Sequence, residues 1–139
     1  GSVLQGPVEA ARILHQLIGR SDREVFVALF LNAKHRVTHA HVVSKGTLDG
    51  ATVHPREVFK AAFLANAQAI VVGHNHPSGD PKESKEDAVV TKRLRMAGVL
   101  LGVELLDSLI VTPQGDYVAS STGVQGHLEL EEQEVTDGH

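Results

Sequence analysis

The chain of 139 residues contains no cysteine and no tryptophan, and only 4% of its residues are aromatic. The absence of cysteine excludes disulfide scaffolds, thiolate zinc sites and cysteine nucleophiles, so any bound metal must be held by His, Asp or Glu. Long apolar runs are also missing, since residues 25–31 and 67–73 are far shorter than the roughly 20 residues that span a bilayer. No basic and then apolar leader opens the sequence. We therefore expect a cytoplasmic protein with no membrane partner.

Most of the chain has no excess of charge of either sign. The formal net charge is −4, but five of the 17 acidic residues follow Leu128, in a segment without Lys or Arg. Residues 1–128 therefore carry 13 basic and 12 acidic groups and are nearly neutral. A domain that binds duplex nucleic acid usually has a clear basic excess, because neutralisation of phosphates supplies most of its affinity. The charge distribution gives no support to a nucleic-acid partner.

The overall composition is typical of one folded domain, with 42% hydrophobic and 22% charged residues. Helices are predicted over residues 7–19, 54–67 and 84–98. The signals are apolar periodicity, Pro at helix starts, a Ser-x-x-Asp cap and Gly at helix ends. β-Branched and apolar runs predict strands over residues 24–31, 36–44, 69–72, 103–111 and 117–120, the first two as a hairpin. Alternation of strands and helices favours a single three-layer α/β domain with a mixed β-sheet and flanking helices.

The end of the chain differs from the rest. After Thr122 the sequence loses apolar periodicity and becomes acidic. We expect the folded domain to span residues 6–122, and residues 123–139 to be an acidic tail that is disordered or ordered by a partner.

The most informative stretch is residues 74–87, HNHPSGDPKESKED. Side chains two apart in extended backbone point to the same side, so His74 and His76 can bind one ion. A turn with two prolines follows, and a helix capped by Ser84 would place Asp87 in its first turn. Ligation by His74, His76 and Asp87 leaves a fourth tetrahedral position for water, which is the arrangement of a catalytic zinc site. Zinc in such a site lowers the pKa of bound water to about 7.

The spacing His-x-His, seven residues, Ser, two residues, Asp resembles the metal signature of the JAMM (MPN+, or JAB) metalloproteases, and the longer string is similar to their RadC branch. Supporting matches are residues 46–48 (GTL), residues 55–60 (PREVFK), Thr91, and Leu106-Asp107. The resemblance covers about residues 6–122. It implies the JAMM/MPN fold, which has a cytidine deaminase-like architecture.

The resemblance also implies a role for each matching residue. His74, His76 and Asp87 match the ligands of one Zn²⁺ per chain, and Glu24 matches the glutamate general base. Ser84 matches the serine that helps to stabilise the oxyanion. Ser84 also has a purely structural interpretation as a helix N-cap, and one hydroxyl can accept one hydrogen bond and donate another.

Two residues and one region depart from the RadC pattern. Glu83 stands where RadC sequences often have Pro, and Ser108 stands where they often have His. The amino-terminal helix-hairpin-helix region of full-length RadC proteins does not occur in this sequence, which lowers the expectation of DNA binding.

Other polar residues carry weaker signals. His39 and His41 repeat the His-x-His pattern, but no carboxylate follows at a comparable spacing, so we interpret them as structural. The sequence does not decide whether Arg56, Glu57 and Asp107 support the site or have a structural role. The loop over residues 44–53 is a candidate wall of the substrate site.

Three functions remain open at this point. The first is a zinc metallopeptidase of the JAMM type that cleaves a peptide or isopeptide bond in a protein or peptide substrate. The second is a DNA repair or recombination accessory protein, as the RadC name implies. The third is an inactive scaffold, which is least favoured because all five expected site positions are occupied. The sequence does not predict an oligomeric state.

Overall fold

A computed structural model describes residues 2–46 and 53–130 of the chain. The elements in chain order are α1 (Pro7–Ile18), β1 (Val25–Leu31), β2 (Val37–Lys45), α2 (Pro55–Leu64), β3 (Ala69–Asn75), α3 (Lys85–Leu101), β4 (Glu104–Val111), β5 (Asp116–Ala119) and β6 (Val124–His127). Among these helices, none is long and apolar enough to cross a membrane.

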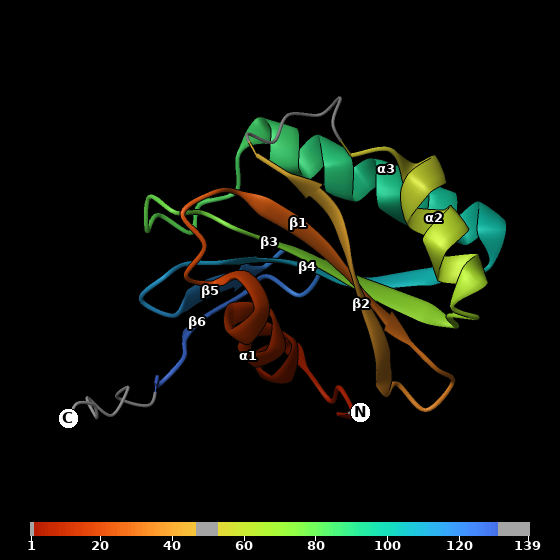
Figure 1. The fold of residues 1–139 in the computed structure, drawn as a ribbon, viewed down its shortest axis with the longest axis horizontal. Helices are drawn as coiled ribbons and strands as arrows, with labels where there is room; N and C mark the ends of the chain where they lie inside the picture. The colour runs from red at the N-terminus through yellow and green to blue at the C-terminus, as the bar shows by residue number, and fades with distance from the viewer. Residues whose placement is uncertain (1, 47–52, 131–139) are drawn as a thin grey trace.

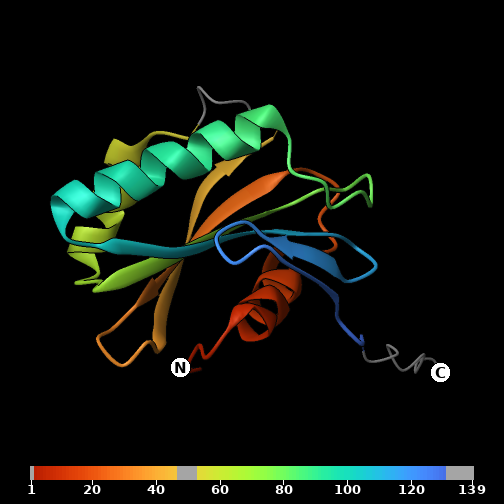
Figure 2. The same cartoon turned by 180° about the vertical axis from the view of Figure 1, so that it is seen from behind.

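The strands form one mixed sheet in the order β2-β1-β3-β4-β5-β6 (Figure 1). β3 and β4 run parallel, and the other neighbouring strands run antiparallel. Helix α1 covers one face, and α2 and α3 cover the other, as Figure 2 shows from behind. This arrangement confirms the predicted three-layer α/β domain.

The two faces of β1 supply two separate cores. Val27 and Leu29 belong to the cluster under α1, whereas Ala28 and Phe30 belong to the cluster under α2 and α3. Because both faces are covered, every residue of β1 is buried, and the strand reads as a continuous apolar run without alternation. The predicted hairpin of β1 and β2 is confirmed.

Strand β3 is longer than the sequence predicts. The predicted strand over residues 69–72 continues to Asn75, because His74 pairs with Phe26 of β1 and Asn75 pairs with Val111 of β4. Two polar residues are atypical of a fully buried strand, so the apolar pattern ends before the hydrogen-bonded strand does. His74 is therefore held inside the sheet and not on a loop.

Two helix ends also differ from the prediction. Helix α2 ends at Leu64, and the left-handed Asn66 (φ 54°) turns the chain towards β3. Helix α3 continues through Gly98 to Leu101 and is terminated by Gly102, which has φ 76°. Gly98 serves close packing instead, since a Cβ there would lie 2.4 Å from the carbonyl oxygen of Val103.

The predicted domain end at Thr122 and the predicted disorder from residue 123 are wrong for residues 123–130. Strand β6 pairs with β5, with Tyr117 opposite Gly126, and Leu128 is buried in the α1-side core. The pairing uses backbone hydrogen bonds and one apolar anchor, so it leaves no periodic apolar pattern in the sequence. The acidic residues from 131 to 139 lie outside the described residues.

Candidate metal centre

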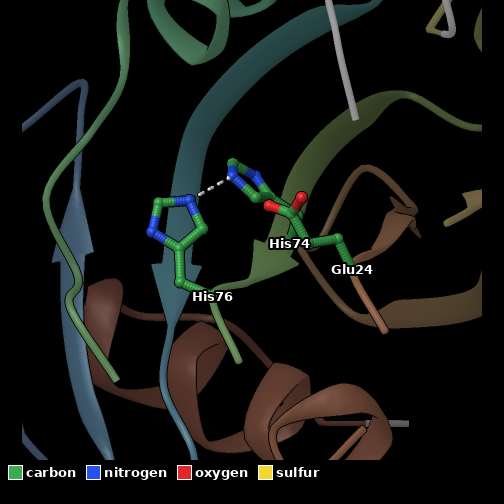
Figure 3. A group of neighbouring side chains, drawn as sticks. All are labelled: Glu24, His74 and His76. Carbon is green, nitrogen blue, oxygen red and sulfur yellow. Dashed lines mark hydrogen bonds between the residues drawn. The ribbon is translucent and has the colours of Figure 1, made fainter. Parts of the chain in front are cut away.

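His74 and His76 meet at the end of β3. Their Nε2 atoms lie 3.0 Å apart, and the dashed line in Figure 3 joins the two tilted rings at this contact. His74 is only 3% exposed and stacks on Phe26, with ring centroids 5.9 Å apart. His76 follows the strand, and its backbone N–H donates to the carbonyl oxygen of Val111. The register of three strands thus fixes both imidazoles.

Asp87 completes the predicted ligand set from the first turn of α3. Its Oδ1 lies 3.0 Å from Nε2 of His74, and its Oδ2 lies 3.3 Å from Nε2 of His76. A reciprocal capping box holds the helix start, since Asp87 N–H donates to Ser84 Oγ and Ser84 N–H donates to Asp87 Oδ2. The cap that starts the helix therefore also orients the carboxylate between the two histidines.

Glu24 approaches the histidines from the residue before β1. One carboxylate oxygen of Glu24 and one ring nitrogen each of His74 and His76 lie within 4.8 Å of one another. Figure 3 shows the carboxylate directed at the imidazole rings. A carboxylate at this distance can ligate a metal or reach a water held beside it.

The donor atoms fit a divalent metal such as zinc. His76 Nδ1 lies 2.8 Å from the carbonyl oxygen of Asp80. Because a carbonyl only accepts, Nδ1 carries a proton, so Nε2, which contacts Asp87, is the nitrogen that can bind a metal through its lone pair once it has released its own proton. Two imidazole nitrogens and a carboxylate are ligands that zinc takes in catalytic sites.

Electrostatics favour the ionised form of Asp87. Burial opposes its ionisation, but the hydrogen bonds from His74 and His76 outweigh burial and hold the pKa of this carboxyl well below its usual range. The hydrogen bond to Asp87 raises the pKa of His76 above its ordinary value, against the effect of burial. The carboxylate is therefore available as an anionic ligand.

An open cleft of about 720 Å³ lies over the site. Its lining includes Glu24, His76, Ser84 and Asp87, together with Gly46 at the end of β2. The cleft therefore brings together four of the five residues singled out in the sequence. The fifth, His74, lies deeper, beneath the cleft. Of the predicted wall over residues 44–53, Gly46 lines the cleft, and residues 47–52 lie outside the described part.

Asn75 is a site residue that sequence reasoning missed. It is fully buried, and its side chain points away from the two histidines between which it stands. Its Oδ1 accepts the Val25 N–H at 2.7 Å, and its Nδ2 donates to the carbonyl oxygens of Ser21 and Arg23 at 3.3 and 2.8 Å. These bonds hold the segment that carries Glu24. The signal in the sequence was an amide at a strand position between two candidate ligands.

Two loop contacts also hold the turn between His76 and α3. Glu83 Oε2 accepts a hydrogen bond from Ser120 Oγ at 2.6 Å. Gln114 Nε2 donates to the carbonyl oxygen of Gly79 at 2.7 Å. Glu83 is a position at which the sequence departs from the RadC pattern. Through its bond with Ser120, it connects the loop to the residue that follows β5.

The remaining candidates lie outside the metal centre. His41 of the exposed strand β2 stacks on Phe30, and His39 Nδ1 contacts Thr38 Oγ1. Asp107 accepts hydrogen bonds from the Ser108 and Ser121 N–H groups, so it holds the chain after β5. We therefore interpret His41 and Asp107 as structural residues.

Comparison with known families finds one match that covers most of the chain. Residues 4–125 match the RadC-like JAB domain. The chain belongs to this family. The RadC-like JAB domain covers nearly all of the described residues, and its match ends within β6, three residues beyond the predicted end of the domain at Thr122.

Curated relatives of this RadC-like JAB domain are UPF0758 proteins. One from Bacillus cereus is 42% identical over 125 residues, which are 90% of this chain and 54% of the relative. One from Shouchella clausii is 47% identical over 109 residues, 78% of this chain and 47% of the relative. One from Halalkalibacterium halodurans is 43% identical over 126 residues, which are 91% of this chain and 53% of the relative. The chain spans about half the length of these relatives.

Proposed function

We propose that this chain is a zinc-dependent hydrolase that cleaves a peptide or isopeptide bond with an activated water molecule. The observation that carries the proposal is the convergence of His74, His76 and Asp87 beside Glu24 at an open cleft. Membership of the RadC-like JAB domain family supports metal-dependent hydrolysis in general. The choice of zinc rests on the donor set of two imidazoles and a carboxylate.

His74, His76 and Asp87 would hold the metal. When bound, zinc polarises the scissile carbonyl and makes a neighbouring water more acidic. The ligands contribute by their fixed positions, since His74 and Asp87 belong to a strand and a helix start that the core holds. Rigid supporting elements keep the reacting groups in productive geometry.

Glu24 would act as the general base and then as the general acid. Its carboxylate takes a proton from water while the water oxygen forms a bond to the carbonyl carbon. The same proton then passes to the leaving nitrogen as the carbon–nitrogen bond breaks. The products are a carboxylic acid and an amine, and Glu24 returns to its ionised form.

Ser84 would stabilise the negative charge that develops on the carbonyl oxygen. Its oxygen already accepts the Asp87 N–H at 3.1 Å, and its side chain is exposed to the cleft. The hydroxyl proton is not used in that bond, so the hydroxyl can donate a hydrogen bond to the substrate oxygen. The two interpretations of Ser84 are therefore compatible.

A protein or peptide is the substrate that this cleft favours. The cleft is open to solvent, and its volume is within the range of about 300–1,000 Å³ seen for ligand pockets. An open cleft admits an extended chain, whose scissile bond can reach the ligands without complete enclosure. The alternative role as a DNA-repair accessory has no specific observation in its favour.

The test is a cleavage screen of a peptide library with the zinc-loaded protein. We expect cleavage that stops when a chelator removes the metal and returns when zinc is added back. Turnover that continues in the stripped protein would contradict the proposal. Absence of any cleavage, together with DNA binding that falls steeply with salt, would favour the accessory role instead.

A further inference from the structure

His74 differs from His76 in one respect that the proposed function does not use. His74 Nδ1 is buried, and no described residue makes a hydrogen bond with it. The ring is 3% exposed, so bulk water does not reach this nitrogen. A buried ring N–H without an acceptor costs free energy, and buried polar atoms are therefore nearly always paired. When Nε2 binds a metal, the ring proton lies on Nδ1, and this nitrogen then needs an acceptor close to it.

A small cavity lies beside this histidine, between β3, β4 and α3. Its volume is about 10 Å³, which matches the space that one water molecule requires, about 10–15 Å³. Its lining includes five polar residues, of which Thr91 and Ser108 carry hydroxyl groups; the others are His74, Glu86 and Asp87. The cavity therefore has room for a single water molecule.

Thr91 and Ser108 supply the polar groups that such a water needs. Thr91 Oγ1 donates to Ser108 Oγ at 2.9 Å, and both residues are buried, at 8% and 4% exposed. A hydroxyl oxygen can accept as well as donate, so this pair still offers acceptor sites and the Ser108 proton. The buried, unpartnered His74 Nδ1 and these two hydroxyls together supply three polar groups, within the two to four that hold a buried water.

We propose that this cavity binds one structural water that accepts a hydrogen bond from His74 Nδ1–H and donates hydrogen bonds to the Thr91–Ser108 hydroxyl pair. The water thereby holds the proton of His74 on Nδ1, so that Nε2, which contacts Asp87 and His76, offers its lone pair to the metal. At His76 the carbonyl oxygen of Asp80 achieves the same result directly. Thr91 and Ser108 are then positioning residues for one of the metal ligands.

This inference rests on the proposed zinc site and makes a separate prediction about it. Groups that orient a ligand histidine typically change metal affinity by about 10- to 100-fold when they are removed. Loss of either hydroxyl should therefore weaken zinc binding although neither residue touches the metal. Thr91→Val removes a hydroxyl and keeps the shape of the side chain. Thr91→Ser keeps the hydroxyl and removes a methyl group.

The experiment combines a crystal structure of the zinc-loaded protein with zinc affinities from chelator competition. In the structure we expect one water within about 3.2 Å of both His74 Nδ1 and an oxygen of Thr91 or Ser108. We expect Thr91→Val and Ser108→Ala to bind zinc about 10-fold more weakly or worse, and Thr91→Ser to bind it nearly as the wild type does. Leu94→Val, a change in the buried core one turn further along α3, is the control for general destabilisation.

Each outcome has a distinct meaning. A cavity without water, or a Thr91→Val protein with wild-type zinc affinity, overturns the inference and leaves the proposed function intact. Equal weakening in Leu94→Val also overturns it, because the effect would then be one of stability. A wild-type protein that binds no zinc contradicts the proposed function, and the role of the water as an aid to metal binding falls with it.

Discussion

Asn75 Oδ1 accepts the backbone N–H of Val25 at 2.7 Å, across 50 residues of sequence. Through this bond and two further bonds from Nδ2, the strand that carries the histidines holds the segment that carries Glu24. The candidate base and the candidate ligands are therefore parts of one hydrogen-bonded unit. The position of Glu24 depends on a side chain that never reaches the metal site.

We predict that Asn75→Ala lowers turnover much more than zinc affinity. The substitution leaves the buried Val25 N–H without its acceptor, which costs about 1–3 kcal/mol, and frees the Glu24 segment to shift. Thermal unfolding, zinc stoichiometry and cleavage rate would be measured together.

The matched control for Asn75→Ala is Asn32→Ala in the β1–β2 turn. Asn32 Oδ1 also accepts backbone N–H groups, from Lys34 and Arg36, but at the turn between β1 and β2. Cleavage that falls equally in both variants would show a general effect of stability and not a role in placing Glu24.

Replacement of His76 should abolish zinc binding. We expect one zinc per wild-type chain and none in His76→Ala, because the variant loses one of the two imidazoles in a site with three protein ligands. Elemental analysis of purified protein measures this directly. His39→Ala, an exposed histidine of β2, should keep its zinc. Stoichiometric zinc in the His76 variant would show that the ligands lie elsewhere.

Glu24→Gln should keep the fold and the zinc but lose hydrolysis. The amide has nearly the shape of the carboxylate yet cannot take a proton, and loss of a general base typically costs about 10²- to 10⁴-fold in rate. The measurements are zinc content and turnover on a peptide found in the library screen. Glu104→Gln is the control, because Glu104 is exposed at the opposite end of the sheet, paired with Ala69. If Glu24→Gln loses zinc as well, Glu24 is a ligand.

Ser84 is predicted to have two roles that two substitutions separate. Ser84→Ala removes the observed cap, which should cost about 1 kcal/mol of stability, and removes the hydroxyl proton, which should cost about 10²-fold in turnover. Ser84→Asp restores a capping oxygen but offers no proton and adds negative charge beside the developing oxyanion. Recovery of stability without recovery of turnover supports both roles. Recovery of both would leave Ser84 as a cap alone.

Truncation after Gly123 should lower the melting temperature. It removes β6 and Leu128, whose burial alone contributes about 1.5–3 kcal/mol. A chain that ends at Leu130 keeps all of these contacts and should unfold as the full chain does. The comparison by differential scanning calorimetry isolates the contribution of residues 124–130. Equal melting temperatures for the two truncated chains would contradict the observed packing of β6.

The sequence by itself determined the local features of this protein. The spacing of apolar residues predicted the helices and most strands. A helix or strand that buries one face needs apolar residues at regular intervals, and those intervals are visible in the sequence. The spacing of His74, His76 and Asp87 follows from two local geometries, an extended strand and a capped helix start, so their meeting could be anticipated. Strand β3 and helix α3 nevertheless ended elsewhere than predicted, since pairing and close packing decide where an element stops.

Only the tertiary structure decided which distant residues meet. The β1–β3 register sets Phe26 opposite His74 and so brings Glu24 to the site, and β6 is held by backbone pairing with β5. The bonds of Asn75, the contact between Glu83 and Ser120, and the cavity beside His74 likewise join residues far apart in the chain. Such contacts leave no period or spacing in the sequence, because they arise from strand register and from side chains that meet only after the sheet has formed.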